Sequence, residues 1–217
     1  MRIVFEQIRT GGDRNFGYLL GDRDAHAAVA VDPAFSPDVF VERARDQGLT
    51  IETIVNTHGH LDHTNGNARL KELTGAPIAA HPDAPAKPDV ALDDGASLTA
   101  GSIEIDVLFV PGHAPDHILL HLPEQKIAIT GDLLFVGKIG GTATEEQART
   151  EYESLQHALE ALPDETTIWP GHDYGARPSS TIALEKASNP FLQAEDFAAF
   201  LELKRTWAEF KARHGLR

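Results

Sequence analysis

The chain has 217 residues, 41% of them hydrophobic and 24% charged, and a formal net charge of −14. This length and composition fit one folded globular domain with a small appendage at most, and they exclude a disordered or fibrous chain. Because 19 Lys and Arg are spread among 33 Asp and Glu, the sequence offers no basic stripe for phosphates, which argues against nucleic acid as a partner.

Cysteine is absent, whereas histidine occurs 11 times. Disulfides, thiolate metal sites and cysteine nucleophiles are therefore excluded, and a bound metal must be held by His, Asp or Glu. No apolar run approaches the ~18 residues of a membrane-spanning helix, so we expect no membrane partner. The first residues, MRIVFEQIRT, lack the regions of a secretory signal. We expect a cytoplasmic protein.

The amino-terminal half alternates short strands with helices. The predicted strands cover residues 3–8, 16–20, 27–31, 51–56 and 77–80, and the predicted helices cover 37–47 and 65–73. Gly/Asp turns separate the first three strands, which predicts an antiparallel meander. The Pro- and Asp-rich residues 81–95 are predicted to form a loop.

The carboxyl-terminal half repeats this organisation. Its predicted strands cover residues 102–110, 118–122, 126–130 and 166–169, and its predicted helices cover 145–162, 182–186 and 195–214. Two halves that each contain a sheet and helices favour two packed sheets with helices on the outside. We expect the apolar face of the last helix, which includes Trp207 and Phe210, to pack on the domain, with a homodimer contact as the alternative.

The sequence THGHLDH, which follows a predicted buried strand, places four potential metal ligands within six residues. These ligands are His58, His60, Asp62 and His63. Offsets of two, four and five residues do not share one helix stripe, so a loop at a strand end suits them better. Gly59 gives the backbone the freedom to turn there. The cluster therefore predicts a metal site rather than a polar turn.

Three further candidates, His113, Asp132 and His172, also follow predicted strands. Each comes directly after a glycine, in the sequences Pro-Gly-His, Thr-Gly-Asp and Pro-Gly-His. Glycine lets the chain bend so that the next side chain points into a shared cleft. One such pair is typical of an ordinary turn, but three of them together with the first cluster predict a single active-site edge.

The motif His-x-His-x-Asp-His, followed in order by Gly-His, Gly-Asp and Gly-His, resembles the metal motifs of the metallo-β-lactamase superfamily over nearly the whole chain. The resemblance implies a mixed α/β fold, a four-layer αββα sandwich over residues 1–177, with a short helical appendage over residues 178–217 packed on it. It also implies one metal ion held by His58, His60 and His113, a second held by Asp62, His63 and His172, and Asp132 as the bridge.

The ligand types limit the metal and the chemistry. Imidazole and carboxylate suit Zn, Fe or Mn, and we expect two divalent ions, with Zn first among them. Two ions ~3.5–4 Å apart can activate water and polarise a carbonyl or phosphoryl group. Their charge exceeds that of the ligand carboxylates, so the site should attract an anion. Asp62 and Asp132 are the predicted catalytic carboxylates.

The motif Gly-His-Asp-Tyr-Gly, followed by Asn-Pro-Phe-Leu, is most similar to glyoxalase II, the hydroxyacylglutathione thioesterase. This resemblance implies that Tyr174 contacts the small-molecule substrate, and Lys138 aligns with a second contact to it. Basic residues follow Asn-Pro-Phe in that family, whereas residues 193–196 here are Gln-Ala-Glu-Asp. We therefore expect a hydrolase of a thioester or related ester, with glutathione as the carrier left open.

Three alternatives remain at this point. Ser-Thr-Ile at 180–182, shortly after His-Asp-Tyr, is also similar to persulfide dioxygenases, which would bind one iron through His58, His113 and Asp132. That branch carries Gly-Arg-Thr-Asp, however, and residues 140–143 are Gly-Gly-Thr-Ala, so the hydrolase is favoured. A lactonase or other esterase of this fold is the second alternative. The third is a non-catalytic metal-binding protein, against which the complete ligand set argues.

Overall fold

The computed structural model describes residues 2–215, and its first sheet is formed by the amino-terminal part of the chain. The strands of this sheet, in spatial order, are β1 (Ile3–Gly11), β2 (Asn15–Asp22), β3 (Ala27–Val31), β4 (Thr50–Val55), β5 (Ile78–Ala80) and β6 (Val90–Ala91). The strands β1, β2 and β3 are antiparallel, as the Gly/Asp turns predicted, and β3 to β6 run parallel to one another.

The second sheet comes from the carboxyl-terminal part. Its strands, in spatial order, are β14 (Ser180–Thr181), β13 (Thr167–Pro170), β10 (Ile127–Gly131), β9 (Ile118–Leu122), β8 (Ile103–Phe109) and β7 (Ser97–Ala100). Only β10 and β13 pair in parallel; the other neighbours are antiparallel. A separate small hairpin joins β11 (Leu134–Phe135) to β12 (Lys138–Ile139).

The alternation of side chains along each strand produces the layers. On β3, Val29 and Val31 lie in the core between the sheets, whereas Ala28 and Ala30 lie in the core beneath the outer helices. Successive residues of a strand point to opposite faces, so a strand that is apolar throughout must be covered on both sides. Buried on both faces, these strands require helices outside each sheet.

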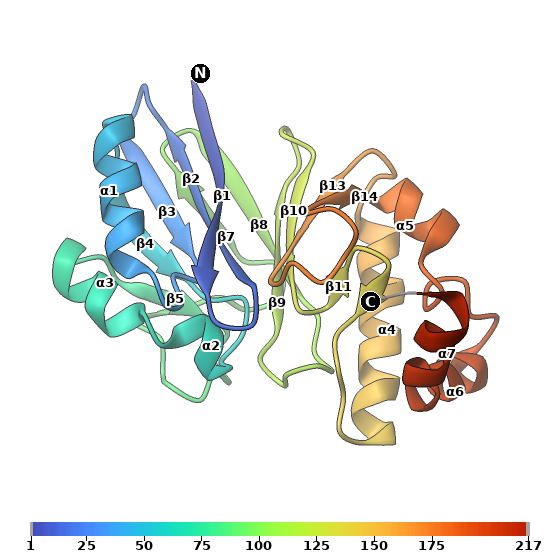
Figure 1. Ribbon diagram of the computed structural model, residues 1–217. Helices are drawn as coiled ribbons and strands as arrows, with labels where there is room; N and C mark the ends of the chain where they lie inside the picture. Colours follow the sequence, from blue (N-terminus) through green and yellow to red (C-terminus); the bar gives the residue numbers. More distant parts are fainter. Residues whose placement is uncertain (1, 216–217) are drawn as a thin grey trace.

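Helices cover both outer faces, as Figure 1 shows. On the first sheet lie α1 (Pro37–Gln47) and α3 (Asn67–Thr74), after the short α2 (Leu61–Thr64). On the second lie α4 (Glu145–Ala161), α5 (Ile182–Ser188), α6 (Phe197–Arg205) and α7 (Trp207–His214). This arrangement confirms the four-layer αββα sandwich. Among residues 2–215, no helix is long and apolar enough to cross a membrane.

Three predicted elements differ in detail from the structure. The helix predicted over 65–73 divides into α2 and α3, and the predicted loop 81–95 contributes β6, which pairs with β5. The final helix predicted over 195–214 is interrupted at Thr206. The Thr206 hydroxyl donates to the Glu202 carbonyl, a local bond that competes with regular helix geometry.

The segment after residue 178 contacts the rest of the protein in two ways. It adds β14 to the edge of the second sheet, beside β13, and its helices pack on α4. Phe200 lies 5.1 Å from the Tyr152 ring of α4, and Trp207 lies 4.7 Å from Phe191 between ring centres. The division of the chain at residue 177 itself stays a prediction.

A buried ion pair also joins the carboxyl-terminal segment to α4. Lys204 of α6 binds Glu151 of α4, and its Nζ donates to the Gly140 carbonyl at 2.9 Å. Glu151 is fully buried, and only 10% of the Lys204 side chain is exposed. Burial raises the pKa of Glu151 to about 7, although the Lys204 ammonium opposes that rise. Lys204 is therefore the main compensation for a carboxylate in the core.

Replacing Lys204 by Met should destabilise the protein by about 3–5 kcal/mol, because it leaves the buried Glu151 without its partner. Denaturant unfolding measures this loss. The double variant Glu151→Leu with Lys204→Met should recover most of it. The matched control is Arg205→Met, whose exposed pair with Glu145 is worth about 0.2–1 kcal/mol. Equal effects of the Lys204 and Arg205 variants would contradict the importance of the buried pair.

Candidate metal centre

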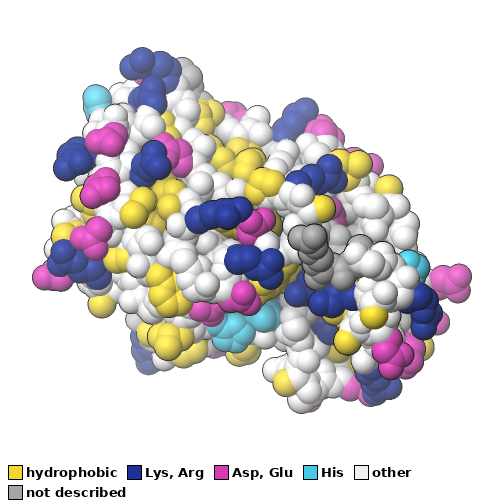
Figure 2. Space-filling model, viewed as in Figure 1, with side chains coloured by type: hydrophobic (Ala, Val, Ile, Leu, Met, Phe, Trp, Pro, Cys, Tyr) yellow, Lys and Arg dark blue, Asp and Glu magenta, His cyan; other side chains and the backbone are white. Residues whose placement is uncertain are grey.

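The parallel strands bring candidate ligands to one edge of the sandwich. His58 follows β4 of the first sheet, and Asp132 and His172 follow β10 and β13 of the second. The carboxyl ends of parallel strands meet at the same edge of a sheet, and the two sheets face each other there. Figure 2 shows histidine side chains at the surface between the two halves, with acidic side chains beside them.

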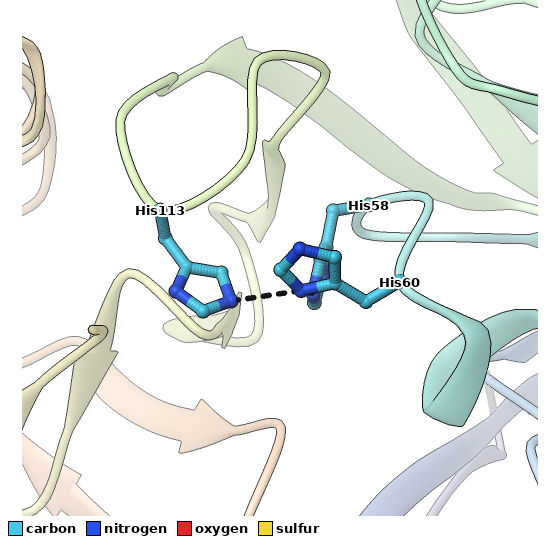
Figure 3. A group of neighbouring side chains, drawn as sticks. All are labelled: His58, His60 and His113. Carbon is cyan, nitrogen blue, oxygen red and sulfur yellow. Dashed lines mark hydrogen bonds between the residues drawn. The ribbon is translucent and has the colours of Figure 1, made fainter. Parts of the chain in front are cut away.

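The first group consists of His58, His60 and His113. His58 and His60 lie on the loop after β4, and His113 approaches from the loop between β8 and β9 (Figure 3). Nδ1 of His60 lies 2.9 Å from Nε2 of His58 and 3.0 Å from Nε2 of His113. Three ring nitrogens from two separate loops therefore converge on one point.

The second group consists of Asp62, His63 and His172. Asp62 and His63 are carried by α2, and His172 follows β13. Nε2 of His63 lies 3.3 Å from Nε2 of His172. The Asp62 Oδ2 atom is 3.5 Å from Nε2 of His172 and 3.7 Å from Nε2 of His63. These two groups have the same members as the two ligand sets that the resemblance implied, and His58, His63 and Asp132 form a third group of possible ligands across them. The assignment of the ligands to two ions stays a prediction.

Asp132 lies between the two groups. Its Oδ2 is 3.5 Å from Nε2 of His113 on one side and 3.2 Å from Nε2 of His172 on the other. Its Oδ1 is 3.6 Å from Nε2 of His63. Within the described part of the chain, this buried Oδ1 has no hydrogen-bond partner. The carboxylate therefore faces both groups of candidate ligands.

Asp32 orients one histidine of each group. This buried carboxylate accepts hydrogen bonds from Nδ1 of His63 at 3.0 Å and from the Thr57 hydroxyl at 2.7 Å. Because the Thr57 proton is used in that bond, the contact at 3.1 Å between Thr57 Oγ1 and Nδ1 of His58 requires that Nδ1 donate. Nε2 of His58 is consequently left with a lone pair when that ring is neutral.

Backbone carbonyls orient two more imidazoles. Nδ1 of His113 donates to the Gly141 carbonyl at 2.8 Å, and Nδ1 of His172 donates to the Asp13 carbonyl at 2.8 Å. Partners of this kind fix the tautomer and the ring plane of a metal-binding histidine. In both rings Nε2 is the nitrogen that faces the other candidate metal ligands.

The charges in the site polarise it strongly. Burial by itself would lower the pKa of His63, but Asp32, Asp132 and Asp62 together raise it to about 9. Burial opposes ionisation of Asp132, yet its hydrogen bond to His172 and the surrounding imidazoles lower the pKa of that carboxyl. Burial lowers the pKa of His58, and neighbouring histidines lower it further. Positive charge is thus favoured near the carboxylates.

The His and Asp side chains of the site fit a bound metal ion. Tetrahedral sites with metal–nitrogen bonds of about 2.0–2.1 Å separate their nitrogens by about 3.3–3.4 Å. The 3.3 Å between His63 and His172 equals this separation, whereas the 2.9 and 3.0 Å in the first group are shorter. In the first group, neutral His58 and His113 direct two lone pairs at one nitrogen of His60, an arrangement that a cation satisfies better than one N–H. A cation would also satisfy the buried Oδ1 of Asp132, which has no hydrogen-bond partner within residues 2–215. Oxygen and imidazole donors without sulfur admit Zn, Fe or Mn.

Tyr174 and Lys138, the predicted substrate contacts, lie together beside the second group. The Tyr174 ring stacks on His172 with 4.6 Å between centres and 3° between planes. Nζ of Lys138 lies 4.2 Å from the centre of the Tyr174 ring. The guanidinium of Arg14 lies 4.9 Å from that ring centre, and the Tyr174 hydroxyl donates to Asp13 at 2.7 Å. A mainly basic rim therefore borders the site.

Three residues that hold the donors in place were missed from the sequence. Asp32 follows β3 just as the ligands follow their strands, a signal that could have found it. His117 is fully buried and its Nε2 accepts the backbone N–H of Asp132 at 2.9 Å; only its place before a strand marked it. Asn15, which contacts Asp62, has no sequence signal. His81, in the predicted loop 81–95, is buried and stacks on Phe109.

The fold and the donor groups define a metal enzyme of the metallo-β-lactamase type. The model of the metallo-beta-lactamase superfamily matches residues 11–88 and 80–172, and the chain belongs to that superfamily. The human mitochondrial persulfide dioxygenase ETHE1 is 31% identical over 206 residues, which cover 93% of this chain and 80% of the relative. The hydroxyacylglutathione hydrolase of Maricaulis maris is 33% identical over 218 residues, with 84% of each chain covered.

Among solved structures, ETHE1 from Myxococcus xanthus has a TM-score of 0.86 to this protein at 30% identity. The match covers 94% of this chain and 91% of the other. Both a hydrolase branch and a dioxygenase branch of the superfamily are therefore similar to this chain over most of its length.

Because Asp132 lies between the two groups, we predict that a substitution of this residue weakens the binding of both ions. Asp132→Ala should lower the affinity for each ion by on the order of 100-fold, since outer partners alone are worth about 10–100-fold. Asp62→Ala should weaken the binding of one ion and leave the affinity for the other unchanged. Elemental analysis and chelator competition measure both. Asp173→Ala is the control, because this nearby carboxylate pairs with Arg9. Retention of both ions by the Asp132 variant would contradict a bridging role.

Proposed function

We propose that this protein is a hydrolase of an anionic thioester that uses two metal ions and resembles glyoxalase II. The observation that carries the proposal is the meeting of two donor groups at one carboxylate, Asp132. Zn is the ion that we propose first, with Fe and Mn as alternatives. When bound, two such ions would supply Lewis acidity toward the acyl oxygen and toward the attacking water.

Three carboxylates around the ions would have separate roles in the reaction. Asp132 would hold the two groups at a fixed separation, because its Oδ2 faces His113 of the first group and its Oδ1 faces His63 of the second. Asp62, whose side chain is 40% exposed, would accept the proton of the water. Asp32 would keep His63 in one tautomer while charge changes beside it.

The basic rim supports an anionic substrate. Nζ of Lys138 and the guanidinium of Arg14 lie 4.2 and 4.9 Å from the centre of the Tyr174 ring, and the charge of Lys211 on α7 also acts on Lys138. Burial lowers the pKa of Lys138, and Lys211 and Arg14 contribute to the same direction. These cations lie outside residues 192–196, which directly follow Asn-Pro-Phe and contain no Lys or Arg. They would bind the carboxylates of a glutathione-like carrier.

A second candidate function is dioxygenation of a persulfide. It is favoured by the similarity of the human and Myxococcus xanthus ETHE1 proteins over more than nine-tenths of this chain. In that case His58, His113 and Asp132 would bind a single iron. The absence of Arg and Asp from residues 140–143 is the observation against it.

One comparison separates these functions. The protein as purified should contain about two metal ions per chain and should cleave S-D-lactoylglutathione without oxygen. Elemental analysis and anaerobic release of thiol are the measurements. One iron per chain, with oxygen consumed in the presence of glutathione persulfide, would instead establish the dioxygenase. If the protein contains two ions but has neither activity, glutathione is excluded as the carrier, and the substrate is another ester or a lactone.

Removal of the rim charges should weaken substrate binding without slowing the chemical step. Lys138→Met and Arg14→Met should each raise KM for an anionic thioester by about tenfold and leave kcat within about twofold, because uniform binding is lost. A neutral thioester should be hydrolysed equally by variants and wild type. Lys126→Met, which removes an exposed cation paired with Glu165, is the matched control. An equal loss on the neutral substrate would contradict charge recognition.

A further inference from the structure

Asn15, at the start of β2, reaches the candidate metal centre from outside the ligand motifs. Its side chain is fully buried. The amide Nδ2 donates to Oδ2 of Asp62 at 2.9 Å and to the Asp62 backbone carbonyl at 3.2 Å. One side chain thus holds both the carboxylate and the backbone of a ligand in the second group.

The backbone around Asn15 holds the opposite side of the same group. Asn15 forms an isolated antiparallel bridge with His172. The Phe16 N–H donates to the Gly171 carbonyl at 2.8 Å, and the Asp173 N–H donates to the Arg14 carbonyl at 2.9 Å. The carbonyl of Asp13, two residues before Asn15, accepts the bond from Nδ1 of His172. Asp62 and His172 therefore meet because both are tied to residues 13–16.

Asp62 needs such a tie more than His63 and His172, the other two members of the second group, do. It lies on α2, a helix of only four residues, and its side chain is 40% exposed. His63, its neighbour in the group, is buried and bonded to Asp32. A short exposed side chain loses rotamer freedom when it is ordered, and this entropy cost weakens metal binding unless the side chain is already ordered in the metal-free protein. The hydrogen bond from Asn15 orders the Asp62 side chain before an ion binds.

The chemistry of the contact requires a donor at this position. Nδ2 supplies protons to two acceptors of Asp62, whereas a carboxylate would supply none and would repel Asp62. Space for the amide comes from Gly12, where an added Cβ would lie 2.6 Å from Oδ1 of Asn15. Among the described residues, Oδ1 has no hydrogen-bond partner, so the two donor contacts are what orient the amide.

We propose that Asn15 is a positioning residue for the second metal ion: its amide holds the Asp62 carboxylate against His63 and His172. Loss of the amide should leave a protein that binds one ion tightly and the second weakly. The first group is unaffected because Asn15 contacts Asp62 alone among the candidate ligands by side-chain hydrogen bonds within residues 2–215. This inference rests on the proposed two-ion centre.

The test compares Asn15→Leu and Asn15→Ala with the wild type, each stripped of metal and titrated with Zn²⁺ against a competing chelator. Leu keeps the volume of the amide, whereas Ala leaves a cavity, and neither donates. The second ion should bind about 10–100-fold more weakly in both variants, with the first within about twofold of wild type. Titration with Co²⁺ should show one spectroscopic signature lost and the other kept.

The matched control is Thr10→Val. Thr10 is buried in the same turn and its hydroxyl donates to the Asn15 carbonyl, but it contacts no candidate ligand. This variant should retain both ions, and thermal unfolding of all the metal-free proteins identifies any general loss of stability. Retention of wild-type affinity for the second ion in both Asn15 variants would overturn the inference. So would equal weakening of both ions.

The metal content of the wild type separates this inference from the proposal beneath it. Two ions in the wild type with no effect of the Asn15 variants would overturn only the role of Asn15. A single ion in the wild type, with the Co²⁺ signature of one site, would overturn the two-ion centre and the inference together.

Discussion

The buried carboxylate of Asp32 is the contact on which both donor groups depend. It accepts bonds from Nδ1 of His63 and from the Thr57 hydroxyl, and Thr57 in turn accepts from Nδ1 of His58. An imidazole whose Nδ1 is bonded in this way can present only Nε2 to a metal ion. One carboxylate thus sets the tautomer of a histidine in each group. Because it is buried, its hydrogen bonds persist without competition from water.

The sandwich makes this contact geometrically available. The strands β3 and β4 run parallel, so Asp32 at the end of one strand lies beside Thr57 and His58 after the end of the other. The second sheet supplies Asp132 and His172 in the same manner from β10 and β13. Glycine makes the turn possible at the first of these: Gly131 has a φ of +49° and packs where an added Cβ would lie 2.7 Å from His117. Ligands from two sheets therefore share one edge.

Two lysines of the carboxyl-terminal segment, Lys204 and Lys211, connect this segment to the surroundings of the candidate site. Through Lys204 it compensates the buried Glu151 and holds the Gly140 carbonyl, next to the Gly141 carbonyl that accepts from His113. Through Lys211 it adds positive charge near Lys138. In a protein of net charge −14, an anionic substrate needs such a local concentration of cations. This segment thus contacts the backbone beside the partner of His113 and adds charge to the basic rim.

From the sequence by itself, the spacing of His and Asp predicted a metal site at one edge of the fold, because such spacing is a local property of the chain. The superfamily and the four-layer sandwich followed from the resemblance of those motifs to a known family, and the ligand roles of the seven residues stay a prediction. The sequence also placed Tyr174 and Lys138 near the site by resemblance. It could not locate Asn15, His117 or Lys204, nor predict the break at Thr206. Those residues act on partners 15 to 53 positions away, or through a side-chain bond inside a helix. Only tertiary structure decides such contacts, since burial and hydrogen bonding between distant segments leave no periodic trace in the chain.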